Sequence, residues 1–569
     1  MEAKERKQQS FLHGAMVLVA ATAIVKVIGA VFKIPLSNLI GDLGFGYFSS
    51  AYDLYLPIYA LAMAGLPVAL SRMIAENMAQ KRYRDVGATL KVARRAFFVT
   101  GFAGFVIMLI AIWPFLYITE GAISLNSTLP SMLAIVPALV ICCIISTYRG
   151  YYEGLRDMYP TAISEVIEAL GKLVLGLSFA YIILKLTKNV AFAAAGAMTG
   201  ITVGTVFAAG YLRIKYKKDG AILTERELES SPPPRTQRRI LKLLLLIAVP
   251  VVLSSLATNI ANMIDVTMVK WLLRRVMDNS SQVIRTMYAE SISAYDRASS
   301  SALTDAQIPT FLYGIRSKAY TMFNLIPTIT SALGVGAIPV LAETWIKKDK
   351  EGTKANLETV IKTAAVIAMP AGLGMAALSP QIMELMYNST ASVEIGAPML
   401  LVLGIAAVFA GITIPLTCIL QAIGKQMVPV RNIAIGAIIK ITVNFILVGN
   451  PSINIVGACV GTLCCYIFIM LADYFCIVRY TGVVPNVGKI LLKPLVAAIA
   501  CGGTAYAVSR ALNSVNAGNL VSTATGIIIG GIIYLVFIVL LRVIEKEDIL
   551  SLPKGKNFIK ALEKFRIIK

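Results

Sequence analysis

Apolar runs of about twenty residues recur along nearly the whole chain, and this recurrence limits the fold more than any other feature. A helix of about twenty residues crosses a hydrocarbon core of roughly 30 Å, because each residue adds 1.5 Å. Apolar residues make up 57% of the 569 residues and charged residues only 15%, which is not the composition of a water-exposed surface. The sequence therefore predicts an all-α, polytopic membrane protein.

We expect about fourteen transmembrane helices, because the apolar runs divide into that many segments of spanning length. The expected spans are 12–36, 48–70, 94–118, 129–149, 160–184, 190–212, 241–269, 319–342, 358–379, 395–420, 428–448, 452–478, 488–509 and 519–543.

The positions of the basic residues predict the orientation of the chain. The sequence holds 53 Lys and Arg against 31 Asp and Glu, and the basic residues gather in alternate loops, including 72–95 and 213–242, and in the tail from Arg542. Basic loops stay in the cytoplasm beside anionic lipid headgroups, so both termini are expected to be cytoplasmic in a bacterial cell membrane. The first apolar stretch is too long for a cleavable signal and is expected to be a retained span. No compact basic domain is present, which argues against a nucleic-acid partner.

The chain is expected to consist of two six-helix lobes, and the lobes resemble each other. Gly154 precedes Pro160, and Lys172 lies twelve residues further on; Gly424, Pro429 and Lys440 repeat this pattern with eleven residues. Six helices per repeat preserve orientation, so the lobes should be related by a pseudo-two-fold axis along the membrane normal. Chance similarity between Gly/Pro-rich apolar segments is the alternative. The expected parts are lobes 1–214 and 240–480 (with an outside insert 270–318), a linker 215–239, and two extra helices with a basic tail in 481–569.

Ionisable side chains inside the expected spans are the candidates for substrate binding. Each costs roughly 2.5–3.5 kcal/mol to insert, so each needs a partner or a water-filled cavity. Lys26, Lys172 and Lys440 fall well inside three different spans, which predicts a cationic chamber for an anionic headgroup such as a phosphate or pyrophosphate. The alternative is that these lysines snorkel or pair to lock helices together. The predicted cavity residues are Lys26, Lys172, Lys440, Glu168, Asn444, Asn259 and Asn262.

A second set of residues is a candidate gate or ion-coupling site. Arg72 with Glu76, and Arg149 with Glu153, have the four-residue spacing at which a helix can pair opposite charges. Ordinary surface ion pairs, which contribute little to stability, are the alternative. The set is completed by Glu165, which shares a helix face with the predicted cavity residues of its span, and by Asp265. Asp265 and Lys33 lie near the outer boundary, where snorkelling or pairing between helices explains them as well as a role in binding does.

The residue types that are scarce or absent exclude several functions. The sequence has one histidine, His13, and eight cysteines without a paired CxxC spacing. We therefore expect no metal and no cofactor. No phosphate-cradling P-loop pattern is present, which argues against an ATPase. A membrane polymerase or ligase would need an acid/base constellation that the expected outside loops lack, so the chain is expected not to be an enzyme. Transport would then be driven by membrane potential, an ion gradient or the gradient of the substrate.

Two motifs resemble those of a known family. They are GLPVALSRMIAE, from Gly65 to Glu76, and RGYYEG, from Arg149 to Gly154, which is followed by PTAISE from Pro160. Together they are similar to the stage V sporulation protein B and MurJ-like flippase group of the multidrug/oligosaccharidyl-lipid/polysaccharide exporter superfamily. The resemblance covers essentially the whole chain.

The resemblance implies two lobes around a central cavity, alternating access, and an undecaprenyl-pyrophosphate-linked glycan as substrate. The expected partners are this lipid-linked glycan, membrane lipids and, as a further candidate, the cell-wall or polysaccharide synthesis machinery. The extra helices 488–509 and 519–543 would shape a groove for the lipid tail. MurJ-like cavities rely on arginines in the first, second and eighth helices, whereas this chain has lysines in the first. A cation-coupled multidrug exporter, which usually has twelve helices and an acidic cavity, is the second hypothesis.

Overall fold

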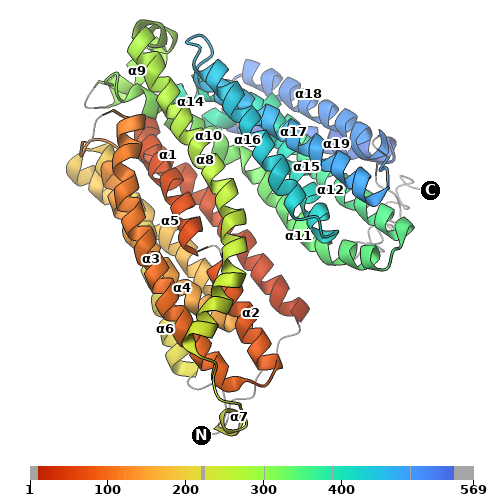
Figure 1. Cartoon of the computed structure of the whole chain (residues 1–569). Helices are drawn as coiled ribbons and strands as arrows, with labels where there is room; N and C mark the ends of the chain where they lie inside the picture. Colours follow the sequence, from red (N-terminus) through yellow and green to blue (C-terminus); the bar gives the residue numbers. More distant parts are fainter. Residues whose placement is uncertain are drawn as a thin grey trace. The chain divides into compact units, whose positions relative to one another are not determined.

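The computed structural model describes residues 11–63, 65–121, 124–219, 225–299, 302–387, 389–486 and 488–543, nearly all of them helical (Figure 1). No strand occurs in these ranges. Two compact units are formed, Met1–Arg274 with Thr304–Gly314, and Arg275–Leu303 with Ile315–Lys569. The predicted all-α class is confirmed. The predicted division at 215–239 stays a prediction.

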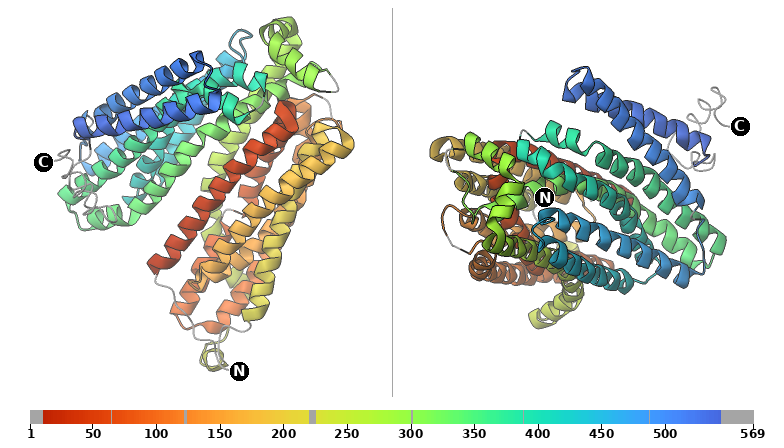
Figure 2. Two further views of the ribbon diagram at one scale, coloured as in Figure 1. Left: turned by 180° about the vertical axis from the view of Figure 1, so that it is seen from behind. Right: turned by 90° about the horizontal axis from the view of Figure 1, so that it is seen from above.

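The first unit is built from long helices that lie side by side (Figure 2). In it α5 packs on α6, α4 packs on α6, and α1 packs on α5. Its helices are α1 Phe11–Met63, α2 Leu66–Ala79, α3 Tyr83–Thr119, α4 Leu129–Gly154, α5 Tyr159–Thr187, α6 Val190–Asp219, α7 Glu225–Glu229, and the parts of α8 Gln237–Met287 and α10 Ile308–Phe323 that fall within its bounds.

The second unit repeats this kind of packing, with α16 on α17 and α15 between α11, α12 and α17. The last two helices pack on each other, and α18 also contacts α12. Its helices are the remainders of α8 and α10, with α9 Ala289–Ala298, α11 Leu325–Ile346, α12 Lys350–Ala377, α13 Ser379–Met386, α14 Thr390–Glu394, α15 Gly396–Ala422, α16 Met427–Val448, α17 Ile455–Thr481, the π-helix Gly488–Leu492, α18 Lys493–Ser514 and α19 Asn519–Leu540.

The described part of the chain has 12 helical segments that are long and apolar enough to cross a membrane. The first of them, Ala20–Ala79, has 60 residues, about three times the length that one crossing needs. It contains Gly41, whose φ of 69° breaks the helix, so it accounts for two crossings. Helix α8, in which several side chains between 250 and 261 are not described, covers the predicted span 241–269. About fourteen crossings therefore agree with the structure.

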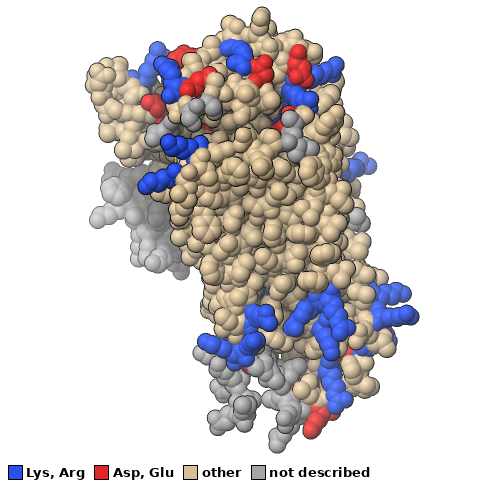
Figure 3. Space-filling model, turned by 90° about the vertical axis from the view of Figure 1, so that its left-hand side faces the viewer, with Lys and Arg blue, Asp and Glu red and all other residues tan. Residues whose placement is uncertain are grey.

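One face of the molecule has the charge distribution of a membrane protein. In Figure 3, charged side chains gather toward two ends, and the broad band between them carries almost none. Helix α3 follows the same rule, because 96–119 contains no charged residue and exposes Phe102, Ile110 and Trp113. That stretch spans roughly 35 Å at 1.5 Å per residue, which matches a hydrocarbon core.

A turn between two helices occurs in both units with the same backbone geometry. Arg156 between α4 and α5, and Gly424 between α15 and α16, both have positive φ, 64° and 78°. The N–H of the following residue bonds back to a carbonyl five residues earlier in both turns, at 3.0 and 2.8 Å. These turns are 268 residues apart (424 minus 156). Gly424 therefore corresponds to Arg156 and not to Gly154, and Lys440 corresponds to Lys172 without the one-residue discrepancy in the sequence pattern.

A second turn is repeated with the same backbone geometry and an offset of 267 residues (348 minus 81). Lys81 between α2 and α3, and Lys348 between α11 and α12, have φ values of 56° and 55°. In both turns the next N–H bonds a carbonyl five residues earlier, at 2.8 and 3.1 Å. Two matching turns in corresponding places favour true duplication over chance similarity.

The segment 270–318, predicted to be an outside insert, is largely helical. Helix α8 continues to Met287 with a break at Ser280, and α9 and the first part of α10 follow. The chain passes between the units within this segment.

Candidate functional site

Two lysines of the first unit lie against one tyrosine. The Nζ of Lys172 on α5 is 4.9 Å from the centroid of the Tyr52 ring, and the Nζ of Lys33 on α1 is 5.9 Å from it. Lys172 also lies 5.1 Å from the ring of Phe32. The break at Gly41 makes this contact possible, because it separates the helical run that carries Lys33 from the run that carries Tyr52.

The two ammonium groups place like charges beside each other, and the carboxylate of Asp53 is nearby. They repel each other through space, and among the described residues neither has a hydrogen bond or an ion pair with a carboxylate. The two nearby acids act on them through space. Glu168 is paired with Arg149, whereas Asp53 accepts a hydrogen bond from the neutral hydroxyl of Tyr313 at 2.5 Å and keeps its charge. Contact with an aromatic ring stabilises a cation by about 0.5–2 kcal/mol but does not neutralise it. The cluster of Lys33, Lys172 and Tyr52 can therefore bind an anion.

Lys26 extends this positive charge along α1. It lies seven residues before Lys33, about 10.5 Å along the same helix face, and its side chain is exposed. Sequence reasoning selected Lys26 and left Lys33 open between binding and anchoring. The seven-residue spacing was the available signal that the two lysines share one face.

The guanidinium of Arg149 bonds across helices, and the predicted intrahelical pair with Glu153 is not its ion pair. Its Nη2 is 2.9 Å from Oε2 of Glu168, and its Nε donates to Oγ of Ser164 at 2.9 Å. Glu165 accepts a hydrogen bond of 3.4 Å from Thr22 on α1. Glu153 is half-buried at the end of α4. Arg149 and Glu168 thus neutralise each other one turn from Lys172.

The pair of Arg72 and Glu76 lies on the surface of α2. Their distance is 2.8 Å, and their side chains are 65% and 50% exposed. An ion pair this exposed contributes about 0–1 kcal/mol. Glu343 and Lys347 form a similar pair at the corresponding end of α11.

The second unit has its own cluster of cations around a tyrosine. The Nζ of Lys440 on α16 is 5.9 Å from the Tyr320 ring, and the Cζ of Arg316 is 4.3 Å from it. The Tyr320 hydroxyl also forms a hydrogen bond with Thr462 on α17. Tyr320 and Lys440 follow Tyr52 and Lys172 by 268 residues, the same offset that separates the turns at Arg156 and Gly424. Each unit therefore carries the same lysine–tyrosine contact.

The other predicted residues differ in burial and in the groups they contact. Asn444 is fully buried and lies against Gly461 of α17, so it packs α16 onto α17. Asn259 donates to the Ser255 carbonyl of its own helix at 2.9 Å. On the same helix, Asn262 is exposed and Asp265 is buried.

Sequence reasoning missed the aromatic half of both clusters, together with Arg316. Tyr52 and Tyr320 gave no signal in isolation because tyrosine is common in membrane spans. Their common offset of 268 residues is recognisable only once the turns at Arg156 and Gly424 set the register of the repeat. Arg316 was missed because the segment that contains it was assigned to an outside loop.

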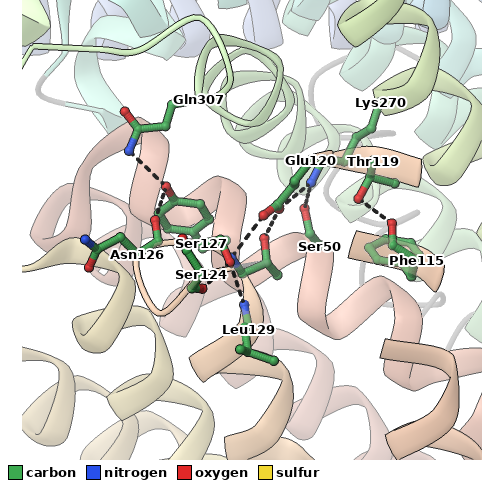
Figure 4. A network of polar contacts seen from close by, with 12 residues as sticks. Ser50, Phe115, Thr119, Glu120, Ser124, Asn126, Ser127, Leu129, Lys270 and Gln307 are labelled. Atoms are coloured by element: carbon green, nitrogen blue, oxygen red, sulfur yellow. Dashed lines mark hydrogen bonds and ion pairs between the residues drawn. The ribbon is translucent and has the colours of Figure 1, made fainter. Parts of the chain in front are cut away.

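A separate buried network holds α8 in the first unit. Lys270 is fully buried, and its Nζ lies 3.0 Å from Oε1 of Glu120 and 3.1 Å from Oγ of Ser50 (Figure 4). Glu120 also accepts hydrogen bonds from the backbone and hydroxyl of Thr128. Both charges of this pair have hydrogen-bond partners, so we interpret the network as a structural contact that holds α8 in place.

Comparison with known proteins agrees with these features. A family model described as "Polysaccharide biosynthesis protein" matches residues 11–345, more than half of the chain, and a second model, MatE, matches 316–446. Stage V sporulation protein B of Bacillus subtilis (strain 168) is 24% identical over 550 residues, which cover 96% of this chain and 98% of that protein. Lipid II flippase MurJ of the same organism is 25% identical over 486 residues, 83% of each chain.

A solved structure has the same fold. Lipid II flippase MurJ in an inward closed conformation matches 92% of this chain and 98% of its own, with a TM-score of 0.65 and 13% identity. The chain is a multi-pass membrane protein whose named homologues include a flippase. With more than half of its length matched by the first model, it belongs to the polysaccharide biosynthesis protein family.

Proposed function

We propose that this chain is a flippase that moves an undecaprenyl-pyrophosphate-linked glycan from the inner to the outer leaflet by alternating access. The glycan would be a peptidoglycan precursor or a polysaccharide repeat unit. The observation that carries the proposal is the pair of ammonium groups, Lys33 and Lys172, on Tyr52 in a membrane-spanning unit. The names of two relatives, a sporulation protein and a lipid II flippase, support the substrate class.

The lysines would bind the diphosphate as point charges. A diphosphate carries several negative charges on freely rotating oxygens, which suits ammonium groups that approach from different helices. In this proposal Lys26 and Lys33 supply positive charge for the headgroup in the first unit, and Lys440 and Arg316 supply it in the second. Arg149 and Glu168 keep each other neutral, so that they leave the charge of Lys172 available to the substrate.

The remaining residues and segments have secondary roles in the proposal. Both termini lie in the cytoplasm of a bacterial cell, and the lipid tail lies along α18 and α19, which expose Ile499, Ile528 and Leu535. The other partners are membrane lipids and the enzymes that make or use the glycan. The gate or coupling set is Arg72, Glu76, Arg149, Glu153, Glu165 and Asp265.

Depletion of the protein tests the substrate. Cells that lose it should accumulate one lipid-linked precursor on the cytoplasmic side, and analysis of the lipid extract identifies which one. A variant with glutamine at Lys26, Lys172 and Lys440 should be inserted in the membrane and should not restore transport. Normal precursor levels after depletion, or full rescue by this variant, would contradict the proposal.

A cation-coupled exporter of small molecules is the second candidate. The MatE model matches 316–446, which supports it. An exporter of cationic drugs needs acidic binding groups, whereas the two charged groups that contact the Tyr52 ring are basic. Drug sensitivity after depletion, with unchanged lipid-linked precursors, would favour this second function.

A further inference from the structure

A buried carboxylate in the second unit, that of Asp473, is not among the predicted site residues. Asp473 on α17 is fully buried. Its Oδ2 accepts a hydrogen bond from the hydroxyl of Thr417 on α15 at 2.9 Å, and its Oδ1 accepts one from the amide of Asn432 on α16 at 2.8 Å. Three helices therefore meet at this one acid.

No cation pairs with this carboxylate. In the described part of the chain its only hydrogen-bond partners are Thr417 and Asn432, and no Lys or Arg lies within ion-pair distance. Two other buried acids differ in this respect, because Asp85 pairs with Arg82 at 2.5 Å and Glu120 pairs with Lys270 at 3.0 Å. A buried acid without a cation is held as an anion only by neutral donors, which makes protonation accessible.

The surroundings fix where a proton would be bound. Arg431 donates to Oδ1 of Asn432 at 3.2–3.3 Å, and a guanidinium has no acceptor. The amide nitrogen of Asn432 must therefore face Asp473, so Oδ1 of Asp473 accepts in either charge state. A threonine hydroxyl can donate or accept, so Thr417 can rotate to receive a proton carried on Oδ2.

The corresponding place in the first unit is built differently. At the 268-residue offset of the turns at Arg156 and Gly424, Thr417 corresponds to Arg149 and Asn432 to Ser164. Arg149 donates to Ser164 and pairs with Glu168, and the position of Glu168 is Gly436 in the second unit. The first unit thus has a fixed, neutral ion pair where the second has a single acid, so the fold does not require Asp473.

Other charged and titratable groups lie on the helices that hold Asp473 and in the turn before α16. On α16 Arg431 contacts Asn432 and also approaches the Cys476 thiol on α17 at 3.5 Å. On α15 the facing residue is the neutral Thr417. The turn before α16 contributes Lys425, whose ammonium lies 4.9 Å from the Tyr480 ring.

We propose that Asp473 is a proton-binding site of the second unit. A proton taken from water joins Oδ2, the carboxylate becomes a neutral acid that donates to Thr417, and the unit gains one positive charge. Release of the proton reverses both changes. The further step, that this proton couples to transport, rests on the proposed flippase function, whereas proton binding does not.

Infrared spectroscopy tests proton binding on the purified full-length protein without substrate. The wild-type protein should gain a carboxylic-acid C=O band on acidification that Asp473→Asn lacks. Thr417→Val should shift this band, because the acid loses its acceptor. The absence of such a band from the difference between wild type and Asp473→Asn would overturn the proposal. If Asp473→Asn does not fold, ¹³C-aspartate labelling of wild type and Thr417→Val gives the same comparison, and a band without a shift would overturn the assignment.

Liposomes with a pH difference test the coupling. Wild-type flipping should change by up to about tenfold per pH unit, the factor that one proton can supply. Asp473→Asn should respond less than twofold, and the exposed-acid control Glu343→Gln should respond like wild type. If the wild-type protein flips the lipid-linked oligosaccharide at the same rate with and without the pH difference, only the proposal of proton coupling is overturned. A wild type that flips nothing would count against the flippase, and the infrared result would still decide proton binding.

Discussion

Replacing Lys172 by glutamine removes one of the two ammonium groups on Tyr52 while it keeps a polar side chain of similar length. The remaining ammonium of Lys33 loses a repulsive neighbour, and the ion pair between Arg149 and Glu168 stays in place. The substitution should therefore leave the thermal stability of the purified protein unchanged or slightly raised. A lysine that merely held helices together would give the opposite result.

The cost to transport follows from the lost contact with the substrate. A hydrogen bond to a charged group contributes about 1.5–3 kcal/mol, which corresponds to roughly 10–150-fold in kcat/KM. Lys172 is only half-buried, and water screens such a charge, so we expect the lower end, about tenfold. The double variant with Lys33→Gln should lose more, although contact with one shared ring prevents simple addition.

Flipping of a lipid-linked oligosaccharide in liposomes, at equal protein amounts, measures this effect. Lys185→Gln is the matched control, because Lys185 is exposed near the end of the same helix and has no place in the cluster. Lys172→Gln at the wild-type rate, or an equal loss in Lys185→Gln, would refute the role of the cluster.

Three further predictions concern the scaffold. Lys270→Met leaves Glu120 buried without its cation and should destabilise the protein by about 3–5 kcal/mol, seen as a lower unfolding temperature in detergent; an unchanged temperature would contradict the structural contact. Gly461→Ala places a methyl group against the Asn444 side chain and should lower the folded yield, whereas a normal yield would argue against that packing. Burial raises the pKa of Asp157 in the turn after α4, so the contribution of Asp157 to folding stability is favourable at low pH and is lost as pH rises through the raised value. Asp157→Asn should therefore stabilise the protein more at pH 7 than at pH 4. An equal effect at both pH values would contradict this.

The sequence contained enough information for the class, the approximate number of spans and the repeat. Long apolar runs predict spanning helices because the bilayer leaves the backbone no other partner. The register of the repeat could not be fixed, because glycine and proline patterns tolerate a shift of one or two residues. The matching backbone turns at Arg156 and Gly424 supplied the register.

The contacts of individual side chains were less predictable. Spacing along one helix suggested that Arg149 pairs with Glu153, whereas the guanidinium reaches Glu168 on the next helix. An interhelical partner depends on how α4 and α5 pack, which periodicity along one helix does not contain. Asp473 escaped notice for a similar reason, since its two partners come from α15 and α16.

The central claim is that this chain carries a lipid-linked anionic glycan across the bilayer. Reconstitution of the wild-type protein in liposomes, with a fluorescent lipid-linked oligosaccharide in both leaflets and a quencher outside, measures that movement directly. The account predicts that the protein makes the inner-leaflet fraction accessible and that Lys172→Gln slows this about tenfold. Equal accessibility with and without protein, under a pH gradient and a membrane potential alike, would contradict it.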